Sequence, residues 1–134
     1  MSFDVEVKGV DELIKKLQSL PEKIQKNVVT GSIRAAASML VKEARLRAPK
    51  ETGDLAKSIG IKKKRPKDRN IVFFTVAPRY KKKHGALGHL LEFGTSKTPA
   101  HPFMRPALEA KATHAINVSK DYMKRRIDRE LAKL

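Results

Sequence analysis

The sequence predicts an α+β fold in which a small, mainly antiparallel sheet packs against two long helices. Residues 21–48 and 106–132 carry apolar side chains at helical spacing over many turns. Between them, two short segments are rich in the β-branched and aromatic residues that favour strands. A chain of 134 residues suffices for one modest core, so we expect a single domain over residues 1–134.

The first half of the chain predicts one strand followed by two helices. Residues 3–7 alternate between apolar and charged side chains, the period of a half-buried strand. A short helix is expected over 11–20, with Asp11 as its N-cap. A second helix is expected over 21–48, because Pro49 ends the pattern. At 1.5 Å per residue this helix would span about 40 Å, which makes it the expected scaffold.

The middle of the chain predicts a hairpin. After a turn and one helical turn, which Thr52 or Asp54 would cap and in which Leu55 points inward, a strand begins over 59–61. A second strand returns over 71–77. The segment between them, residues 62–70, is crowded with lysine and arginine and is the expected hairpin tip. A second basic loop precedes a helical turn expected over 90–93.

A proline-rich loop is expected over 94–106, ahead of a charged C-terminal helix over 106–134. Pro99, Pro102 and Pro106 each fix φ and remove a backbone donor, which excludes helix or central strand between them. Pro106 suits the first turn of the following helix. The loop would carry Phe103 and Met104, either as plugs of the helix–sheet core or as exposed anchors for a neighbouring subunit.

Several other residues are expected to shape this loop. Glu92 is the only acid from Arg69 to Leu108, and we expect an ion pair with Arg105 or Arg79, within the fold or across a subunit boundary. Gly94 and Thr95 would set the loop geometry, and His101 would bond to backbone. The candidate assembly residues are Glu92, Phe93, Gly94, Thr95, Pro99, His101, Pro102, Phe103, Met104 and Arg105.

The charge balance predicts a polyanionic partner. Thirty lysines and arginines against 14 acids give a net charge of +16, which attracts nucleic acid or an acidic protein surface. Aromatic residues are only 5%, so stacking on single-stranded bases is poorly supported. The candidates to face duplex DNA or an acidic partner are Lys62, Lys63, Lys64, Arg65, Lys67, Arg69, Lys81, Lys82 and Lys83.

No catalytic, cofactor or metal site is expected. Cysteine is absent, and the four histidines, at positions 84, 89, 101 and 114, match no metal-ligand spacing. Glu92 has no evident nucleophile or second acid as a partner, and the glycines form no phosphate-binding loop. The N-terminus does not resemble a signal peptide, and no apolar run reaches the ~20 residues that cross a bilayer, so no membrane partner is expected.

Three motifs carry a family resemblance: TGDLAKSI at 52–59, EFGT at 92–95 and PAHPFMRPAL at 99–108. They resemble the neck proteins of long-tailed bacteriophages, which are head–tail joining, tail-completion or tail-component proteins. The resemblance implies a non-enzymatic virion protein that forms a homo-oligomeric ring with connector and tail proteins and lets double-stranded DNA pass. It implies location in the virion neck or tail, and in host cytoplasm before assembly. The alternative is a stand-alone basic protein that binds duplex DNA non-specifically.

Overall fold

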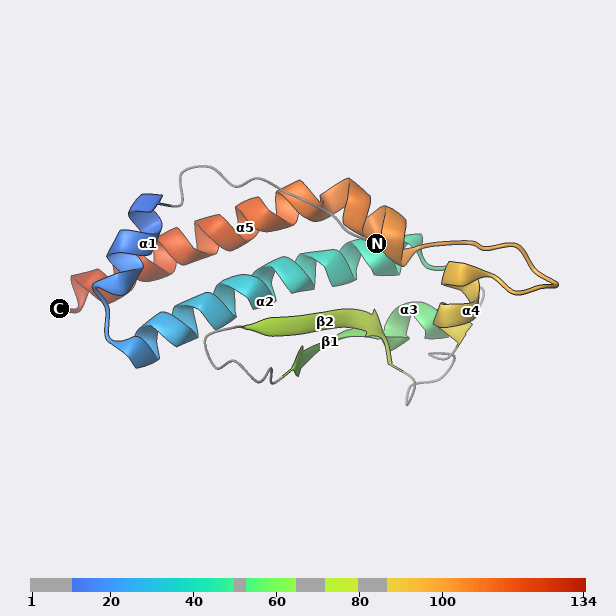
Figure 1. Ribbon diagram of the computed structural model, residues 1–134, viewed down its shortest axis with the longest axis horizontal. Helices are drawn as coiled ribbons and strands as arrows, with labels where there is room; N and C mark the ends of the chain where they lie inside the picture. Colours follow the sequence, from blue (N-terminus) through green and yellow to red (C-terminus); the bar gives the residue numbers. More distant parts are fainter. Residues whose placement is uncertain (1–10, 50–52, 65–71, 80–86) are drawn as a thin grey trace.

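The computed structural model describes residues 11–49, 53–64, 72–79 and 87–134 of the chain. Its elements are α1 (Asp11–Gln18), α2 (Glu22–Arg47), α3 (Asp54–Ser58), β1 (Ile59–Lys64), β2 (Phe73–Pro78), α4 (Leu87–Phe93) and α5 (Met104–Ala132). Helices α2 and α5 lie side by side in opposite directions, and the two-stranded sheet lies against α2 on the side away from α5 (Figure 1). The predicted α+β class, with its two long helices, is confirmed.

Small side chains allow α2 and α5 to pack closely. The buried face of α2 includes Ala37 and Ala44, and that of α5 includes Ala107, Ala112 and Ala115. A Cβ on Gly31 of α2 would overlap the Tyr122 hydroxyl of α5. Gly31 therefore faces α5 and leaves room for this tyrosine.

The buried apolar residues form two clusters at opposite ends of this helix pair. The first joins the end of α2 to the sheet and to the start of α5, and consists of Val41, Ala44, Ala48, Leu55, Ile59, Phe103 and Ala107. The second holds α1 against the start of α2 and the end of α5, and consists of Leu13, Leu20, Val28 and Ile127. The first cluster fixes the part of the molecule from which the proline-rich loop emerges.

The hairpin differs from its sequence prediction in where β1 ends. Strands β1 and β2 pair antiparallel, from Ile59 opposite Pro78 to Lys64 opposite Phe73. Lys62, Lys63 and Lys64 therefore belong to β1, and the prediction that they form the hairpin tip is wrong. Strand pairing continues through Lys62 and Lys63 because their long side chains reach solvent while their backbone stays in the ladder. The expected strand over 3–7 lies outside the described residues.

The short helices also differ in detail from expectation. The N-cap of helix α3 is Gly53, whose φ is +78°, so Asp54 is the first helical residue rather than the N-cap. The alternative cap, Thr52, lies outside the described residues. Leu55 is buried as predicted. Helix α4 is longer than the expected single turn, and α5 begins at Met104, so that Pro106 lies in its first turn.

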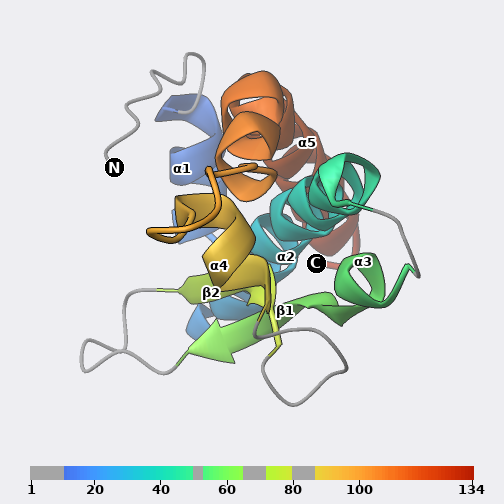
Figure 2. The same cartoon turned by 90° about the vertical axis from the view of Figure 1, so that its right-hand side faces the viewer.

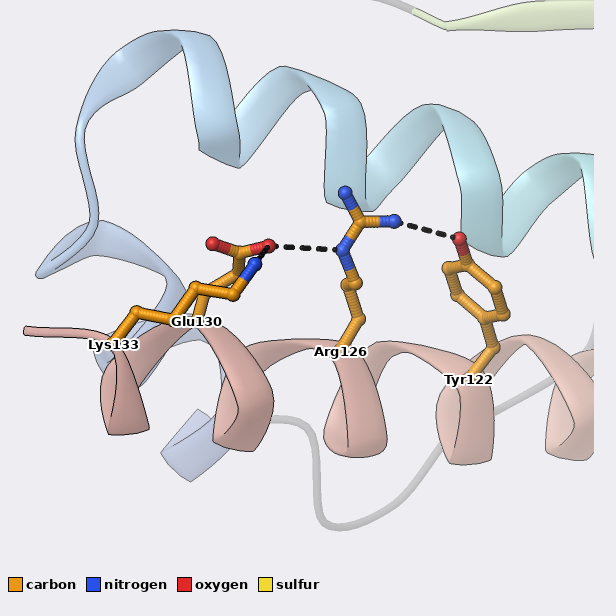
Figure 3. Close-up of polar contacts among 4 residues, drawn as sticks. All are labelled: Tyr122, Arg126, Glu130 and Lys133. Carbon is orange, nitrogen blue, oxygen red and sulfur yellow. Dashed lines mark hydrogen bonds and ion pairs between the residues drawn. The ribbon is translucent and has the colours of Figure 1, made fainter.

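A polar network joins the last turns of α5 on the side facing α2 (Figure 3). Arg126 donates from Nε to the Glu130 carboxylate over 3.2 Å and from Nη1 to the Tyr122 hydroxyl over 3.2 Å, and Lys133 lies 3.4 Å from the same carboxylate. Burial opposes ionisation of Glu130, but the hydrogen bond from Arg126 and the charge of Lys133 outweigh it and lower the pKa of Glu130. The hydrogen bonds of Arg126 to Glu130 and to Tyr122 raise the pKa of Arg126.

This network predicts a pH-dependent contribution to stability. Because the Glu130 pKa is lower in the folded chain than its ordinary value of 4.5, the contribution is fully present above that value and is lost as pH falls through the folded-state pKa. We expect the difference in free energy of unfolding between the wild type and Glu130→Gln to shrink from pH ~6 to pH ~3. Urea unfolding at several pH values measures it. Glu109→Gln, which alters the exposed pair with Arg105, is the control, and a difference that stays constant with pH would contradict the prediction.

Candidate assembly surface

The loop between α4 and α5 projects from the end of the molecule (Figure 1). All of its residues from Thr95 to Pro102 are exposed. Two large apolar side chains are also exposed on α4 just before it, Leu90 at 47% and Phe93 at 73%. We call the exposed residues 95–102, together with Leu90 and Phe93, the loop surface.

The base of the loop is a closed turn. Thr95 donates its N–H to the Thr98 carbonyl over 2.9 Å, and its Oγ1 accepts the Thr98 N–H over 3.0 Å. Gly94 ends α4 with φ +74° and donates to the Leu90 carbonyl over 2.7 Å. A Cβ on Gly94 would lie 2.8 Å from the backbone nitrogen of Ala100, so both the conformation and the space require glycine.

The returning half of the loop is also held by backbone. His101 donates its N–H to the Leu91 carbonyl over 2.7 Å, while its side chain is exposed. The expected hydrogen bond of His101 to backbone therefore exists, but the peptide group makes it rather than the imidazole. This bond attaches the returning half of the loop to α4, while the Thr95–Thr98 turn closes its first half.

Glu92 connects the loop to α5. Its carboxylate accepts the N–H groups of Phe103, Met104 and Arg105 over 2.8, 2.9 and 2.9 Å. These are donors at the start of α5 that have no partner within the helix, and a negative charge is favourable at a helix N-terminus. Glu92 thus caps a helix that lies beyond the loop.

Within the subunit, the predicted ion pair of Glu92 with Arg105 or Arg79 is wrong, while a pair across a subunit boundary stays a prediction. Arg105 pairs instead with Glu109 over 3.1 Å, one turn further along α5. Arg79 donates to the Ile61 carbonyl over 2.8 Å. The sequence suggested a cation for Glu92 because the surrounding residues are basic, whereas the backbone donors of α5 satisfy its oxygens.

Phe103 is a core residue. Its exposed fraction is 1%, and it packs in the first apolar cluster with Val41, Leu55 and Ile59. Met104 is partly buried against the same cluster. The interpretation of Phe103 as an exposed anchor is therefore wrong, and the apolar side chains that remain exposed near the loop are those of α4.

Among the basic residues predicted to face DNA or an acidic partner, those that the structure describes do not form one patch. Lys62 and Lys63 are exposed on β1, and because neighbouring strand residues point to opposite faces, their side chains diverge. Lys64 completes the strand. Arg65, Lys67, Arg69, Lys81, Lys82 and Lys83 lie outside the described residues.

A cationic cavity that the sequence did not predict lies between α2 and β1. It measures about 390 Å³, and its polar lining includes Arg34, Arg45, Lys57 and Arg79. Arg34 and Arg45 are eleven positions apart on α2, which is about three turns, so they share a face of the helix. That spacing is the signal in the sequence from which the shared face of Arg34 and Arg45 follows.

Comparison with known families identifies the kind of protein. A family model described as "Bacteriophage HK97-gp10, putative tail-component" matches residues 11–94, more than half of the chain. The chain belongs to the HK97-gp10-like family of bacteriophage tail components. Neither the comparison with curated proteins nor that with solved structures gave a match.

The match places two of the three motifs within the HK97-gp10-like region. It runs from the start of α1 to Gly94, so it includes TGDLAKSI and the first three residues of EFGT. PAHPFMRPAL follows its last matched residue. Membership in this family makes the chain a bacteriophage structural protein of the tail, located in the virion.

The described part of this HK97-gp10-like chain offers no candidate metal site. It has no cluster of three or more histidine, cysteine or acidic residues able to hold a metal ion. Ser58 is buried and donates its hydroxyl to the Leu55 carbonyl over 2.5 Å, which is a structural role. Among the helices described, none has the length and apolarity to cross a membrane.

Proposed function

We propose that this tail component is a structural subunit of the head–tail junction. It assembles there as a homo-oligomeric ring that contacts connector and tail proteins and surrounds the path of double-stranded DNA. The observation that carries the proposal is the loop surface, which is exposed along its whole length and yet held in place. An internal Thr95–Thr98 turn, the bond from His101 to α4 and the Glu92 cap at the end of the loop hold it. Family membership supports a role in the tail, and the loop supports a role in joining subunits.

The rigidity of the loop favours binding. A flexible loop loses conformational freedom when it binds, and this cost reduces affinity. In this chain the loop is already ordered before it binds a partner, so less conformational entropy is lost on binding. The loop is ordered by the Thr95–Thr98 turn, the His101–Leu91 bond and the Glu92 cap. Exposed Leu90 and Phe93 supply apolar area beside the loop, as the centre of a protein interface requires.

The position of the loop favours a ring. A loop that projects from one end of a subunit contacts a different surface on its neighbour, which gives a heterologous interface. Repetition of a heterologous interface closes into a ring when the rotation allows it. In a two-fold symmetric dimer, by contrast, the same surface patch of both subunits would have to be self-complementary.

The net charge of +16 supports passage of DNA through such a ring. Exposed cations such as Lys62 and Lys63 attract phosphates without base recognition and release counterions. We expect neutralisation of Lys62, Lys63, Lys64 and Arg65 to leave the fold intact and to impair completion of particles or DNA passage. Normal infectious particles carrying those changes would contradict this part of the proposal.

The loop surface is tested by the triple variant Ser96→Asp, Lys97→Glu and His101→Asp. These side chains are exposed, and the hydrogen bonds of the loop at these positions use backbone groups, so the stability should change by less than about 0.5 kcal/mol. We expect phage that carry the variant to accumulate unjoined heads and tails, as counted by electron microscopy, with a matching loss of infectious particles.

A matched control separates the loop from the change in charge. Lys124→Glu with Arg129→Glu alters the net charge by the same amount on exposed positions of α5. It should give normal particles. Two outcomes would contradict the proposed role of the loop surface. One is that the loop variant gives joined, infectious particles, and the other is that both variants give equal defects.

The net charge also favours a second candidate, a stand-alone protein that binds duplex DNA non-specifically. Its affinity would fall steeply with salt because binding releases counterions. Gel filtration separates the two: a ring subunit forms a large species alone or with tail and connector proteins. A protein that remains a monomer with those partners and binds duplex tightly at moderate salt would favour the second candidate.

A further inference from the structure

We propose that the cavity between α2 and β1 binds the carboxylate of an acidic side chain from a partner protein. The inference rests on the proposed structural role, which supplies the partner. The cavity is lined by Arg34 and Arg45 from α2, by Lys57 from α3 and by Arg79 after β2, so segments distant in sequence bring four cations together. It is separate from the loop surface, none of whose residues line it.

The edge of β1 that faces away from β2 positions two of these cations. Arg79 donates its backbone N–H to the Ser58 carbonyl over 2.9 Å, which extends the pairing with β2 by one residue. Because hydrogen-bonded pairs alternate along an antiparallel ladder, the carbonyls of Ile59 and Ile61 point to the opposite edge. There the Ile59 carbonyl accepts from Arg45 Nη2 and the Ile61 carbonyl from Arg79 Nη2, both over 2.8 Å.

These bonds hold both guanidinium groups without neutralising them. A guanidinium carries five N–H donors in a planar fork, and each of these bonds to a neutral carbonyl uses one. The others remain suited to bidentate contact with a carboxylate. Because the two carbonyls are already bonded, a strand from another chain has fewer free groups with which to extend the sheet at this edge.

The positive charge in the cavity is not balanced by acids of the described chain. Arg34 lies over the Phe74 ring at 5.8 Å, a contact that leaves its charge intact. The ion pairs between described residues involve other cations: Glu43 pairs with Arg47, Glu109 with Arg105, and Glu130 with Arg126 and Lys133. In the described part of the chain, no carboxylate lies within 4.0 Å of the four cavity cations.

The shape of the cavity favours an acidic side chain over duplex DNA. Its volume of about 390 Å³ and its apolar lining by Val41, Ile59 and Ile61 suit the methylene groups and carboxylate of a glutamate or aspartate. Duplex DNA is a thick convex rod whose phosphates are reached by side chains that project outward. Arg45 and Arg79 are instead folded onto the edge of β1. A partner carboxylate bound by the cations of this cavity would fix how the two proteins are aligned at their interface.

Gly60 offers a way to disturb the cavity without changing its charge. A Cβ at this position would lie 2.6 Å from Arg79 Nε and 3.0 Å from its Cζ. Gly60→Ala should therefore displace the Arg79 side chain from the Ile61 carbonyl. Arg45→Lys provides the complementary change, because it keeps the charge and removes the planar fork.

The test is a titration of the ¹⁵N-labelled full chain with a blocked tetraglutamate peptide, followed by NMR. We expect shifts concentrated at the backbone amides of Arg45, Gly60, Ile61 and Arg79. Arg45→Gln should weaken binding by about tenfold, as expected for loss of charge-assisted hydrogen bonds. Gly60→Ala and Arg45→Lys should weaken it by a smaller factor at unchanged net charge. Circular dichroism confirms that each variant is folded.

Lys124→Gln is the matched control, because it removes one charge from an exposed position of α5. Equal weakening by Lys124→Gln and Arg45→Gln, or shifts spread over the whole basic surface, would overturn the proposal. A short DNA duplex is titrated in parallel, and a duplex that displaces the peptide and shifts the same cavity amides would overturn it in favour of DNA. The titration needs no phage particles. If peptide binding fails while the loop variant still blocks head–tail joining, only the cavity is refuted; the reverse outcome refutes the loop.

Discussion

Replacement of Phe103 by alanine is expected to lower the free energy of unfolding by about 3–5 kcal/mol. The side chain is 1% exposed and fills the space between Val41, Leu55, Ile59 and Ala107. Its removal takes away the burial of a whole aromatic ring and leaves a cavity that helices α2 and α5 cannot easily close. Because Phe103 immediately precedes α5, the loop would also lose its fixed end.

Urea unfolding of Phe103→Ala and Phe103→Leu measures this effect, with leucine expected to recover part of the loss. Phe93→Ala is the matched control, because its ring is 73% exposed and its removal should cost less than about 1 kcal/mol. If Phe103→Ala unfolds at the same urea concentration as the wild type and fails only in particle assembly, then Phe103 is an interface anchor after all.

Glu92→Ala is expected to destabilise the chain by about 2–4 kcal/mol. A helix cap alone contributes about 1 kcal/mol, and hydrogen bonds to a charged acceptor contribute more than neutral ones. Glu92 accepts N–H groups from Phe103, Met104 and Arg105, and alanine would leave all of them without this acceptor. The Phe103 and Met104 donors are partly buried, so water replaces the carboxylate poorly.

Two further variants resolve this effect. Glu92→Gln keeps one acceptor oxygen but loses the charge, so it should fall between wild type and alanine. Glu109→Ala removes an exposed acid from α5, the helix that Glu92 caps, and should cost less than about 0.5 kcal/mol. Thermal and urea unfolding would rank the variants. A Glu92→Ala protein as stable as Glu109→Ala would show that the α5 cap contributes nothing.

These two residues explain why the loop motifs combine an acid, a glycine and an apolar plug. Glu92 and Phe103 join α4 to the start of α5 from opposite ends of the loop, and Gly94 allows the chain to leave α4 in the required direction. The exposed residues between them are then presented in one conformation. Stability and assembly are therefore separable: core and cap variants should affect unfolding, and exposed loop variants should affect joining.

Periodicity and proline placement were sufficient to predict most of the secondary structure. The helix over 21–48 was predicted because its apolar pattern persists between Pro21 and Pro49, and α2 spans Glu22–Arg47. The last helix was predicted from Pro106 onward, and α5 begins at Met104. These features are local, since a proline or a 3.6-residue period acts within a few residues of itself.

The sequence by itself determined the α+β class, the limits of the long helices, the stiffness of the proline-rich loop and the excess of positive charge. Tertiary structure alone decided that Phe103 is buried, that Glu92 meets backbone donors rather than an arginine, and that Arg34, Arg45, Lys57 and Arg79 share a cavity. The physical reason is distance along the chain. Burial, hydrogen-bond partners and shared cavities depend on which segments pack together, and residues 11 to 62 positions apart meet here only because α2, the hairpin and α5 fold onto one another.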